Sequence, residues 1–449
     1  MNLDLTVGKA GPTLFKYSLP MFVSVIFQQM YSLADSAIAG KFAGEDALAA
    51  IGASYPITMI FMAICTGCNI GCTVVLSQCY GGKRIESFKT GASTSIIFGI
   101  VLSSVLTITA VLCSPLMLTA IKTPSDIFDD AKAYLMLYLG GFIFLFLYNM
   151  VNGIFNAMGD SRTPLYFLIA SSVGNVLLDL LFVAVFDYGV VGAAVATLIA
   201  QGLACIGALT VVLFRLKRLT TEIKPSRFSF NMLGTILFVA IPSVLQSSFV
   251  SVGNLLIQSL INGCGKGVIA GFSAAFKINT FYLTCIGTTG NAVSAFTAQN
   301  VGAGKPERVK KGLFAGLIIG FILTMPFLVS NVLAGKERLF IFLDEGGSEA
   351  LTVGNMFLMI TAPFYLFITV KLICDGVLKG TKSMALFMTS TFTDLILRVI
   401  LAFILFNFLG YSGIFSSWPV GWVAGAILSY SFFMVVCKRL MKNNRAIPN

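Results

Sequence analysis

The sequence contains no histidine among its 449 residues. Without imidazole there can be no Ser-His-Asp triad, no Cys-His dyad and no histidine metal site. Charged residues are also scarce, at 11% of the chain, against roughly 25% in an ordinary soluble domain. A GxxxxGK[ST] phosphate-binding loop is absent, so we expect no bound nucleotide. These absences argue against a soluble enzyme and against an ATP-driven protein.

Apolar side chains, in contrast, make up 57% of the chain. A helix that crosses a bilayer needs about 20 mostly apolar residues, and the sequence offers twelve such runs between charged or Gly/Pro-containing breaks. Strand-like alternation is missing, which favours an all-α integral membrane protein over a β-barrel. The predicted spans are 14–39, 48–79, 91–112, 131–158, 163–186, 190–214, 233–262, 268–299, 312–334, 352–378, 384–407 and 413–437.

The lysines and arginines predict the orientation of these spans. Of the 30 basic residues, 21 lie in the two terminal segments and the even-numbered loops, six lie in the odd-numbered loops, and three lie within spans. Because basic residues concentrate on the cytoplasmic side, both termini of this multi-pass plasma membrane protein are expected in the cytoplasm. The formal net charge of +11 is spread over short segments without interleaved aromatics, so we expect no nucleic-acid partner.

An internal repeat divides the chain. Residues 77–91 align with residues 298–312 at an offset of 221, with Gln78 matching Gln299 and Glu86 matching Glu307. We therefore predict an N-terminal six-helix lobe (1–214), a cytoplasmic linker (215–230) and a C-terminal six-helix lobe (231–449). Copies of six spans keep the same orientation, so a pseudo-two-fold axis along the membrane normal should relate them, with a cavity between two rocking lobes.

Ionisable residues inside spans are functional candidates because a charge at the bilayer centre is costly. Lys371 and Asp375 are four residues apart on one helix, as are Asp394 and Arg398, so each pair can neutralise itself. For these pairs a structural and a functional role both remain open, and Lys277 is left unassigned. The full set is Asp35, Asp179, Asp375, Asp394, Lys277, Lys371 and Arg398.

Asp35 and Asp179 have no nearby cation in sequence. Asn175 lies one helical turn before Asp179, which places an amide oxygen and a carboxylate on one face of the fifth span. Hard oxygen groups of this kind suit Na⁺, and a poorly solvated carboxylate suits a proton. The sequence therefore predicts a coupling-cation site in the first half of the chain, for either ion.

Residues 19–52 resemble the opening span and loop of the multidrug and toxic compound extrusion (MATE) family. Pro20, Gln28, Gln29, Asp35, Gly40, Gly44 and the ALAA run from Ala47 stand in the expected order. The likeness continues through residues 152–164, 175–182 and 189–197 and their second-half echoes, so it covers essentially the whole chain.

The resemblance implies two six-helix lobes and export of mostly cationic, amphipathic drugs in exchange for Na⁺ or H⁺. In the DinF-like branch the cation site lies in the N-terminal lobe and matches Asp35, Asn175, Asp179 and Thr197, with a backbone carbonyl near Ala193. The NorM-like branch uses acids of the seventh and tenth spans, a pattern from which this sequence departs.

Aromatic and amide side chains could line a substrate cavity, although aromatics at such spacing more often pack in a core. The substrate-cavity candidates are Gln28, Tyr31, Phe281, Tyr282, Phe364 and Tyr365. The expected partners are a small-molecule substrate and the lipid bilayer, with a monomeric protein and no cofactor beyond the coupling ion.

Two other functions compete with drug efflux. A lipid or lipid-linked oligosaccharide flippase would need several cavity Arg or Lys residues for a pyrophosphate group, and only Lys277, Lys371 and Arg398 are available. An integral-membrane enzyme would need general acids and bases, but the spans contain no His and no Glu.

Overall fold

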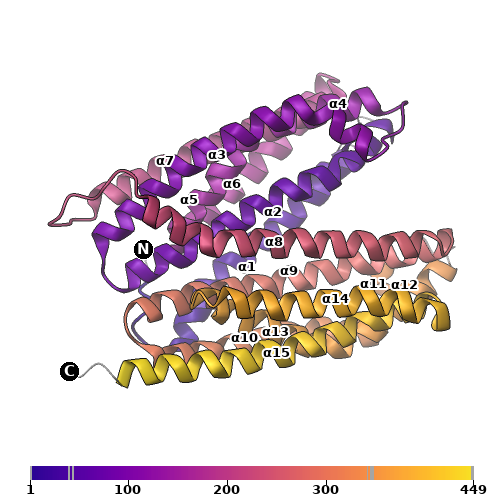
Figure 1. The fold of residues 1–449 in the computed structure, drawn as a ribbon. Coiled ribbons are helices and arrows are strands. Elements are labelled where there is room, and N and C mark those ends of the chain that lie inside the picture. The colour runs from indigo at the N-terminus through magenta and orange to yellow at the C-terminus, as the bar shows by residue number, and fades with distance from the viewer. Residues whose placement is uncertain (1–2, 39–40, 43–44, 341, 344–347, 446–449) are drawn as a thin grey trace. The chain divides into compact units, whose positions relative to one another are not determined.

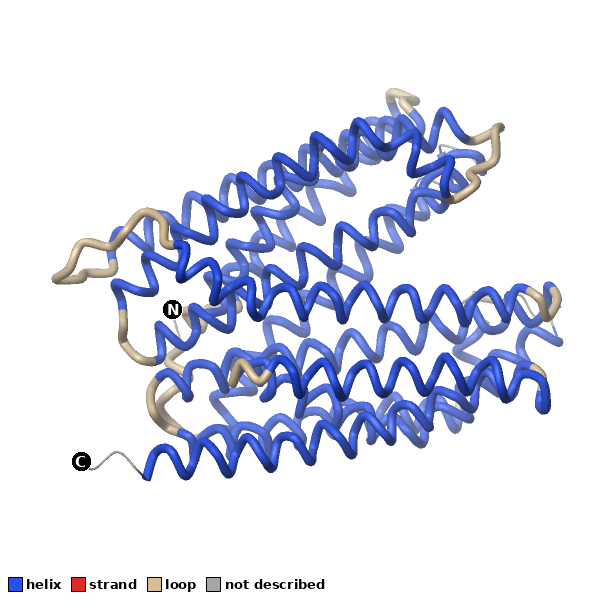
Figure 2. The backbone as a smooth tube through the Cα atoms, viewed as in Figure 1, coloured by secondary structure: helices blue, strands red, loops and turns tan. Residues whose placement is uncertain are grey.

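The protein was analysed as a computed structural model that describes residues 3–38, 41–42, 45–340, 342–343 and 348–445 (Figure 1). Over these residues the chain is built of helices joined by short loops, and no β-strand is found among them (Figure 2). Long apolar runs explain this, because a helix satisfies all of its backbone hydrogen bonds internally where no water is present. The predicted all-α class is confirmed.

Two compact units make up the structure. The first consists of Met1–Asp4 and Leu19–Val244, and the second of Leu5–Ser18 and Leu245–Asn449. Two helices, α1 (Ala10–Ile38) and α8 (Phe230–Asn262), are divided between the units. The other helices of the first unit are α2 (Glu45–Gly81), α3 (Ile85–Ala120), α4 (Phe128–Gly140), α5 (Phe142–Ala157), α6 (Arg162–Asp179), the π-helical turn η2 (Leu180–Val185) and α7 (Gly189–Arg218).

The second unit continues from α8. Its short 3₁₀ turn η3 contains Pro363 and separates α12 from α13 within one predicted span. Its helices are α9 (Lys266–Gly302), α10 (Pro306–Leu333), α11 (Gly335–Leu339), α12 (Ser348–Thr361), η3 (Ala362–Phe364), α13 (Tyr365–Gly380), α14 (Met384–Leu409) and α15 (Tyr411–Arg445).

Every predicted span overlaps a helix of the described structure. Among the described residues, ten helical segments are long and apolar enough to cross a membrane, or eleven if α4 and α5, which meet at 41°, form one bent span. Helix α1 is not among them, although its 29 residues are long enough, because Lys16, Gln28, Gln29 and Asp35 make it less apolar. The chain is therefore a multi-pass membrane protein.

The predicted linker, 215–230, lies wholly within the first unit. Four hydrogen bonds of the described residues attach it to α3. In two of them the segment is the donor: Ser226 N–H donates to the Thr90 hydroxyl at 3.1 Å, and Ser229 N–H donates to the Thr94 hydroxyl at 3.0 Å. The first half of α8 belongs to the same unit. The unit boundary therefore falls at Val244, inside a helix, and not in the polar segment that the sequence suggests.

Each unit has its own core. In the first, Phe142 packs edge-to-face on Phe61 with ring centroids 5.0 Å apart, and Phe146 and Phe155 are fully buried. In the second, Trp418 and Trp422 pack edge-to-face at 5.8 Å. Close packing of this kind stabilises helix contacts in a bilayer, where burial of apolar surface between helices contributes little.

Residues 5–8, which belong to the second unit, are held by side-chain donors that bond to their backbone carbonyls. The Arg308 guanidinium donates to the carbonyls of Leu5, Val7 and Gly8, at 3.1, 3.0 and 2.6 Å. Asn300 Nδ2 also donates to the Leu5 carbonyl, at 3.1 Å. Lys305 Nζ donates to the Thr6 carbonyl at 3.0 Å. Charge-assisted bonds are the stronger kind, so the bonds from Arg308 and Lys305 contribute most to holding this non-helical segment.

Candidate functional site

Asp35 and Asp179, here called the acid pair, lie together in the first unit. Asp35 comes from α1 and Asp179 is the last residue of α6, and a side-chain hydrogen bond joins the two carboxyl groups. Asp179 is 1% exposed. Among the described residues neither acid forms an ion pair with a lysine or arginine. The structure thus brings together the two acids that the sequence singled out.

Asn175 links the acid pair to α1 and α7. In the amide orientation that satisfies its neighbours, Nδ2 donates to Asp179 Oδ2 at 3.0 Å and to the Tyr31 hydroxyl at 3.2 Å, while the amide oxygen accepts the Thr197 N–H at 3.1 Å. Tyr31, a substrate-cavity candidate, thus contacts this site. In this orientation the amide nitrogen faces Asp179, and in the opposite one the amide oxygen that the sequence predicted faces Asp179.

The backbone around Asp179 departs from regular helix. The α-helical pattern ends at this residue and the chain continues as the π-helical turn η2, a feature often found at functional sites. Helix α7 approaches η2 closely at Gly192, where a Cβ atom would lie 3.1 Å from the Phe182 carbonyl carbon and oxygen. Ala193, next in sequence, is buried one turn before Thr197. Small residues of α7 therefore hold Thr197 near the acid pair.

This arrangement is suited to holding one small cation. Two carboxylates in contact repel each other unless a proton or cation lies between them. The site offers carboxylate, hydroxyl and amide groups, which are hard ligands suited to Na⁺ or H⁺. One oxygen of Asp179, Oδ1, is buried and accepts no N–H or O–H donor bond from the described residues.

The remaining substrate-cavity candidates are scattered. Gln28 is exposed on α1, and Phe281 and Phe364 are half-buried. Tyr282 and Tyr365 are fully buried, with stacked rings 3.9 Å apart. These two tyrosines fill the core of the second unit, so substrate contact by them stays a prediction.

A hydrogen-bond network explains the burial of Tyr282. Its hydroxyl donates to the Tyr365 carbonyl at 2.9 Å and lies 2.8 Å from the Thr369 hydroxyl, which is 2.8 Å from that of Thr324. Buried hydroxyl groups require such partners. The network joins α9, α10 and α13, so these tyrosines are structural.

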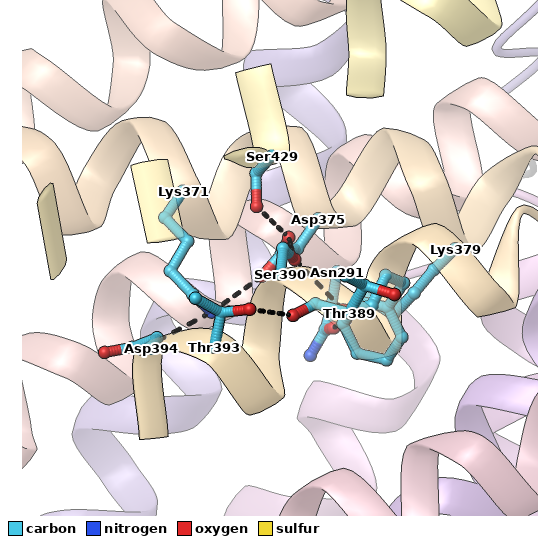
Figure 3. Close-up of polar contacts among 10 residues, drawn as sticks. Asn291, Lys371, Asp375, Lys379, Thr389, Ser390, Thr393, Asp394 and Ser429 are labelled. Atoms are coloured by element: carbon cyan, nitrogen blue, oxygen red, sulfur yellow. Dashed lines mark hydrogen bonds and ion pairs between the residues drawn. The ribbon is translucent and has the colours of Figure 1, made fainter. Parts of the chain in front are cut away.

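Four buried ionisable residues of the second unit are here called the charge cluster: Lys371, Asp375, Asp394 and Arg398. Figure 3 shows the first three of them close together. Lys371 Nζ lies 2.9 Å from Asp375 Oδ2 and 3.8 Å from Asp394 Oδ2. Asp375 Oδ1 accepts hydrogen bonds from Ser429 at 2.6 Å and Ser390 at 3.2 Å. The predicted Lys371–Asp375 pair is confirmed.

The second predicted pair is not a direct ion pair. Within the described chain Asp394 has an ion-pair contact with Lys371 and none with Arg398, although the charge of Asp394 still acts on Arg398. Arg398 instead places its guanidinium over the Trp418 ring, 4.3 Å from the centroid. The indole face attracts the cation and outweighs the i,i+4 spacing. Lys277, left unassigned above, is exposed and lies 5.4 Å from the Phe342 ring centroid.

Sequence reasoning missed the Asp160 cluster in the loop before α6. Asp160 accepts hydrogen bonds from Thr163 N–H at 3.1 Å and the Thr163 hydroxyl at 2.6 Å, and from the Arg215 guanidinium. Burial acts to raise the pKa of Asp160, but the bonds from Thr163 and the positive charge of Arg215 together lower it below its usual value. The sequence signal was the Asp-x-x-Thr spacing before a helix, which is typical of a capping turn.

Comparison with known proteins places these features in a family. A model of the MatE family matches residues 20–181 and 242–404. The chain is 28% identical over 381 residues to the probable multidrug resistance protein YpnP of Bacillus subtilis, covering 85% of each. It is 27% identical over 336 residues to an FAD transporter of Shewanella oneidensis, covering 72% of each.

Solved structures share the fold. A multidrug resistance MATE family transporter in an outward-facing conformation matches with a TM-score of 0.91 at 22% identity, over 98% of this chain and 99% of that one. The family match spans both halves of the chain and includes Asp35 and Asp179. The chain belongs to the MatE family, the multidrug and toxic compound extrusion proteins.

Proposed function

We propose that this protein is a secondary active transporter that exports amphipathic, often cationic, compounds in exchange for Na⁺ or H⁺ by alternating access. The observation that carries the proposal is the acid pair: two carboxyl groups in hydrogen-bond contact, with no cationic side chain paired to them in the described part of the chain. Acids inside a membrane span, such as the buried Asp179 and the half-buried Asp35, typically bind a transported ion or proton. Membership of the family supports the same conclusion.

Coupling would follow from the helices that meet at the acid pair. A cation that binds between Asp35 and Asp179 removes their mutual repulsion and so favours close packing of α1 against α6. Asn175 passes this change to α7 through the Thr197 N–H. A ligand can shift a conformational equilibrium only by its different affinity for the two states, so the bound cation must favour the state with low drug affinity.

The orientation of Asn175 bears on the choice of ion. With its nitrogen directed at Asp179, the amide gives Na⁺ no oxygen ligand on that side, and it would have to rotate before Na⁺ could bind. A proton requires no rotation. We therefore propose H⁺ as the coupling ion, with Na⁺ as the alternative that the experiment below distinguishes.

We further propose that the protein works as a monomer in the plasma membrane with both termini in the cytoplasm. The excess of basic residues in the terminal segments and even-numbered loops supports this orientation. A lipid-linked oligosaccharide flippase has less support, because Lys371 and Arg398 are buried and occupied by Asp375 and Trp418. Neither is placed to bind a pyrophosphate group.

The test is transport by purified protein in proteoliposomes. Ethidium serves as the cationic probe and FAD, the substrate named for the S. oneidensis relative, as an anionic one, each under an imposed pH gradient or Na⁺ gradient. We expect ethidium export driven by the pH gradient, and loss of at least about tenfold in Asp35→Asn and Asp179→Asn.

Asp187→Asn is the matched control. Asp187 is exposed in the loop after η2 and has a positive φ of 55°, a conformation that asparagine also adopts readily. It should transport like the parent. Full ethidium transport by either acid-pair variant would refute the coupling role. Transport of FAD alone would correct the substrate class, and a requirement for Na⁺ would correct the ion.

A further inference from the structure

One face of α9 is polar along much of its length. Counting from Lys277, polar residues recur after three, seven, eleven and fourteen positions, which is the spacing of a single helical face. All of them are exposed or half-buried, and α9 contains no Asp or Glu. This face, here called the polar stripe, consists of Lys277, Thr280, Thr284, Thr288 and Asn291.

The polar stripe is unlike a surface that faces lipid. Lipid-facing strips of spanning helices are apolar, whereas ionisable residues within spans face the protein interior or a water-filled space. Helix α9 is the least apolar of the ten candidate spans among the described residues. The Thr284 and Thr288 hydroxyls each donate to the carbonyl one turn earlier, at 2.8 Å. They need no partner from another helix, so the stripe presents a hydrophilic surface to a solute.

Lys379, in the last turn of α13, is bound to the end of the polar stripe. Its Nζ donates to Asn291 Oδ1 at 3.1 Å (Figure 3) and lies 5.5 Å from the Phe387 ring centroid. Lys379 is 8% exposed, yet within the described chain no carboxylate lies at ion-pair distance from it. A buried ammonium group is costly unless an acid or several acceptors surround it.

The charges around Lys379 leave a positive excess. Asp375, one helical turn earlier, attracts Lys379, and Lys371 repels it; Asp375 itself bonds directly to Lys371. The described buried ionisable residues of the second unit are three cations and two acids, with a formal sum of +1: Lys371, Lys379, Arg398, Asp375 and Asp394. An anion bound at the end of the polar stripe would balance this charge.

Asn291 and Gly287 offer a donor and space for such an anion. An ammonium group can only donate, so the Asn291 amide oxygen faces Lys379 and its Nδ2 donor is directed elsewhere. Asn291 is half-buried and therefore partly accessible. At Gly287, one turn earlier on the same face, no atom of another described helix lies within 4 Å of a Cβ position. A donor beside a positive charge and unfilled space is suited to an oxyanion.

We propose that Asn291 and Lys379 bind the carboxylate or phosphate group of an amphipathic anion or zwitterion, which reaches them along the polar stripe. Asn291 Nδ2 donates to an oxygen of that group, and Lys379 supplies the positive charge. Lys277, at the other end of the stripe and about 21 Å away at the rise of an α-helix, attracts the same group there.

The inference deepens the proposed function and, as a statement about exported compounds, rests on it. It narrows the substrate class to compounds that carry an oxyanion, with or without a cationic group. The phosphate of an anionic lipid headgroup has the same chemistry, so the experiment must separate a soluble compound from a lipid.

Fluorescence anisotropy of the purified full-length protein in phosphatidylcholine nanodiscs tests the site without an ion gradient. Fluorescein is the anionic probe, and rhodamine 6G is a cationic probe with the same ring system. We expect fluorescein to bind, and Lys379→Met to weaken its binding by at least about tenfold through loss of the charge, without weakening rhodamine 6G binding. Lys311→Met removes an exposed lysine of α10 and is the matched control, with fluorescein binding like the parent.

Asn291→Asp gives a second readout if Lys379→Met does not fold. The new carboxylate would pair with Lys379, so we expect a higher melting temperature and loss of fluorescein binding. Phosphatidylglycerol in the nanodisc, at a salt concentration that screens surface charge, identifies the source of the anion. Displacement of fluorescein supports the oxyanion site and assigns it to a lipid headgroup, and unchanged binding assigns it to a soluble compound.

Two results would overturn the proposal: no fluorescein binding by the parent, or equal fluorescein affinity in the parent, Lys379→Met and Asn291→Asp. The assay requires neither a gradient nor the acid pair. Failure of ethidium export in the transport test above therefore leaves this result unaffected, and the two proposals can fail separately.

Discussion

Arg215, in the last turn of α7, donates a hydrogen bond to the carboxylate of Asp160, which lies two residues before α6. The guanidinium also donates to the Thr163 hydroxyl at 2.8 Å and lies over the Phe155 ring. One buried acid thus joins the end of α7 to the start of α6, the two helices that carry Thr197 and Asn175. The stability of the first unit should therefore depend on the charge of Asp160.

Asp160→Asn should lower the free energy of unfolding by about 1–3 kcal/mol at neutral pH, the usual cost of losing hydrogen bonds to a charged group. The lowered pKa of Asp160 means that this stabilisation is complete above the unfolded-state pKa of roughly 4. The stabilisation is lost as pH falls through the pKa of Asp160 in the folded state, which is lower still. The difference in the free energy of unfolding between the parent and Asp160→Asn should therefore become smaller below about pH 4.

Thermal unfolding in detergent measures this with a thiol-reactive dye, since eight of the ten cysteines are buried and become reactive on unfolding. Asp160→Ala should be less stable than Asp160→Asn, because alanine also removes the acceptor for the Arg162 and Thr163 N–H groups. If the difference in melting temperature between the parent and Asp160→Asn does not change with pH, the charge of Asp160 does not contribute to stability.

Arg308→Ala should release the N-terminal segment. The variant removes the donor shared by three carbonyl acceptors, those of Leu5, Val7 and Gly8. Hydrogen exchange of the amides of residues 5–8 should accelerate by at least about tenfold, equivalent to ~1.4 kcal/mol. Lys311→Ala, an exposed substitution on the same helix, is the matched control. Unchanged exchange in Arg308→Ala would mean that other contacts hold the segment.

Gly421→Ala should destabilise the second unit. Its new methyl group would lie 2.5 Å from Asp394 Oδ1 and 2.8 Å from the Asp394 carbonyl oxygen, so α15 must move away from α14. Overpacking of this kind costs typically about 1–3 kcal/mol. Gly287→Ala on α9 is the control, because no described atom lies within 4 Å of a Cβ there. The melting temperatures of both variants are measured with the thiol-reactive dye. Equal melting temperatures would disprove the close approach of α15 to Asp394 at Gly421.

The sequence was sufficient for the helices and for the residues of the acid pair. Apolar runs of span length leave little choice of secondary structure, and an acid without a nearby cation is conspicuous in such a run. Asp35 and Asp179 could therefore be selected before any coordinates were known. The role of the pair as an ion site remains a prediction.

Contacts between side chains of different helices explain what the sequence could not predict. The i,i+4 rule predicted an Asp394–Arg398 pair, but Trp418, from another helix, attracts the guanidinium instead. The side-chain amide of Asn175 was expected to offer its oxygen to the site, yet the Thr197 N–H occupies that oxygen. Tyr282 and Tyr365 are of a residue type that is common on binding surfaces. Only the structure shows that the Tyr282 hydroxyl bonds to threonine hydroxyls inside the core.

The division of α1 and α8 between the units has a consequence for how such a protein could have arisen. Residues 5–18 lie in the first half of the chain but belong to the second unit, and residues 230–244 lie in the second half of the chain but belong to the first unit. Cutting the chain at 215–230 would thus leave each half without a helical end supplied by the other. An ancestral half-length protein would have had to exchange these ends between two copies, as a domain-swapped dimer does, before fusion made the exchange intramolecular.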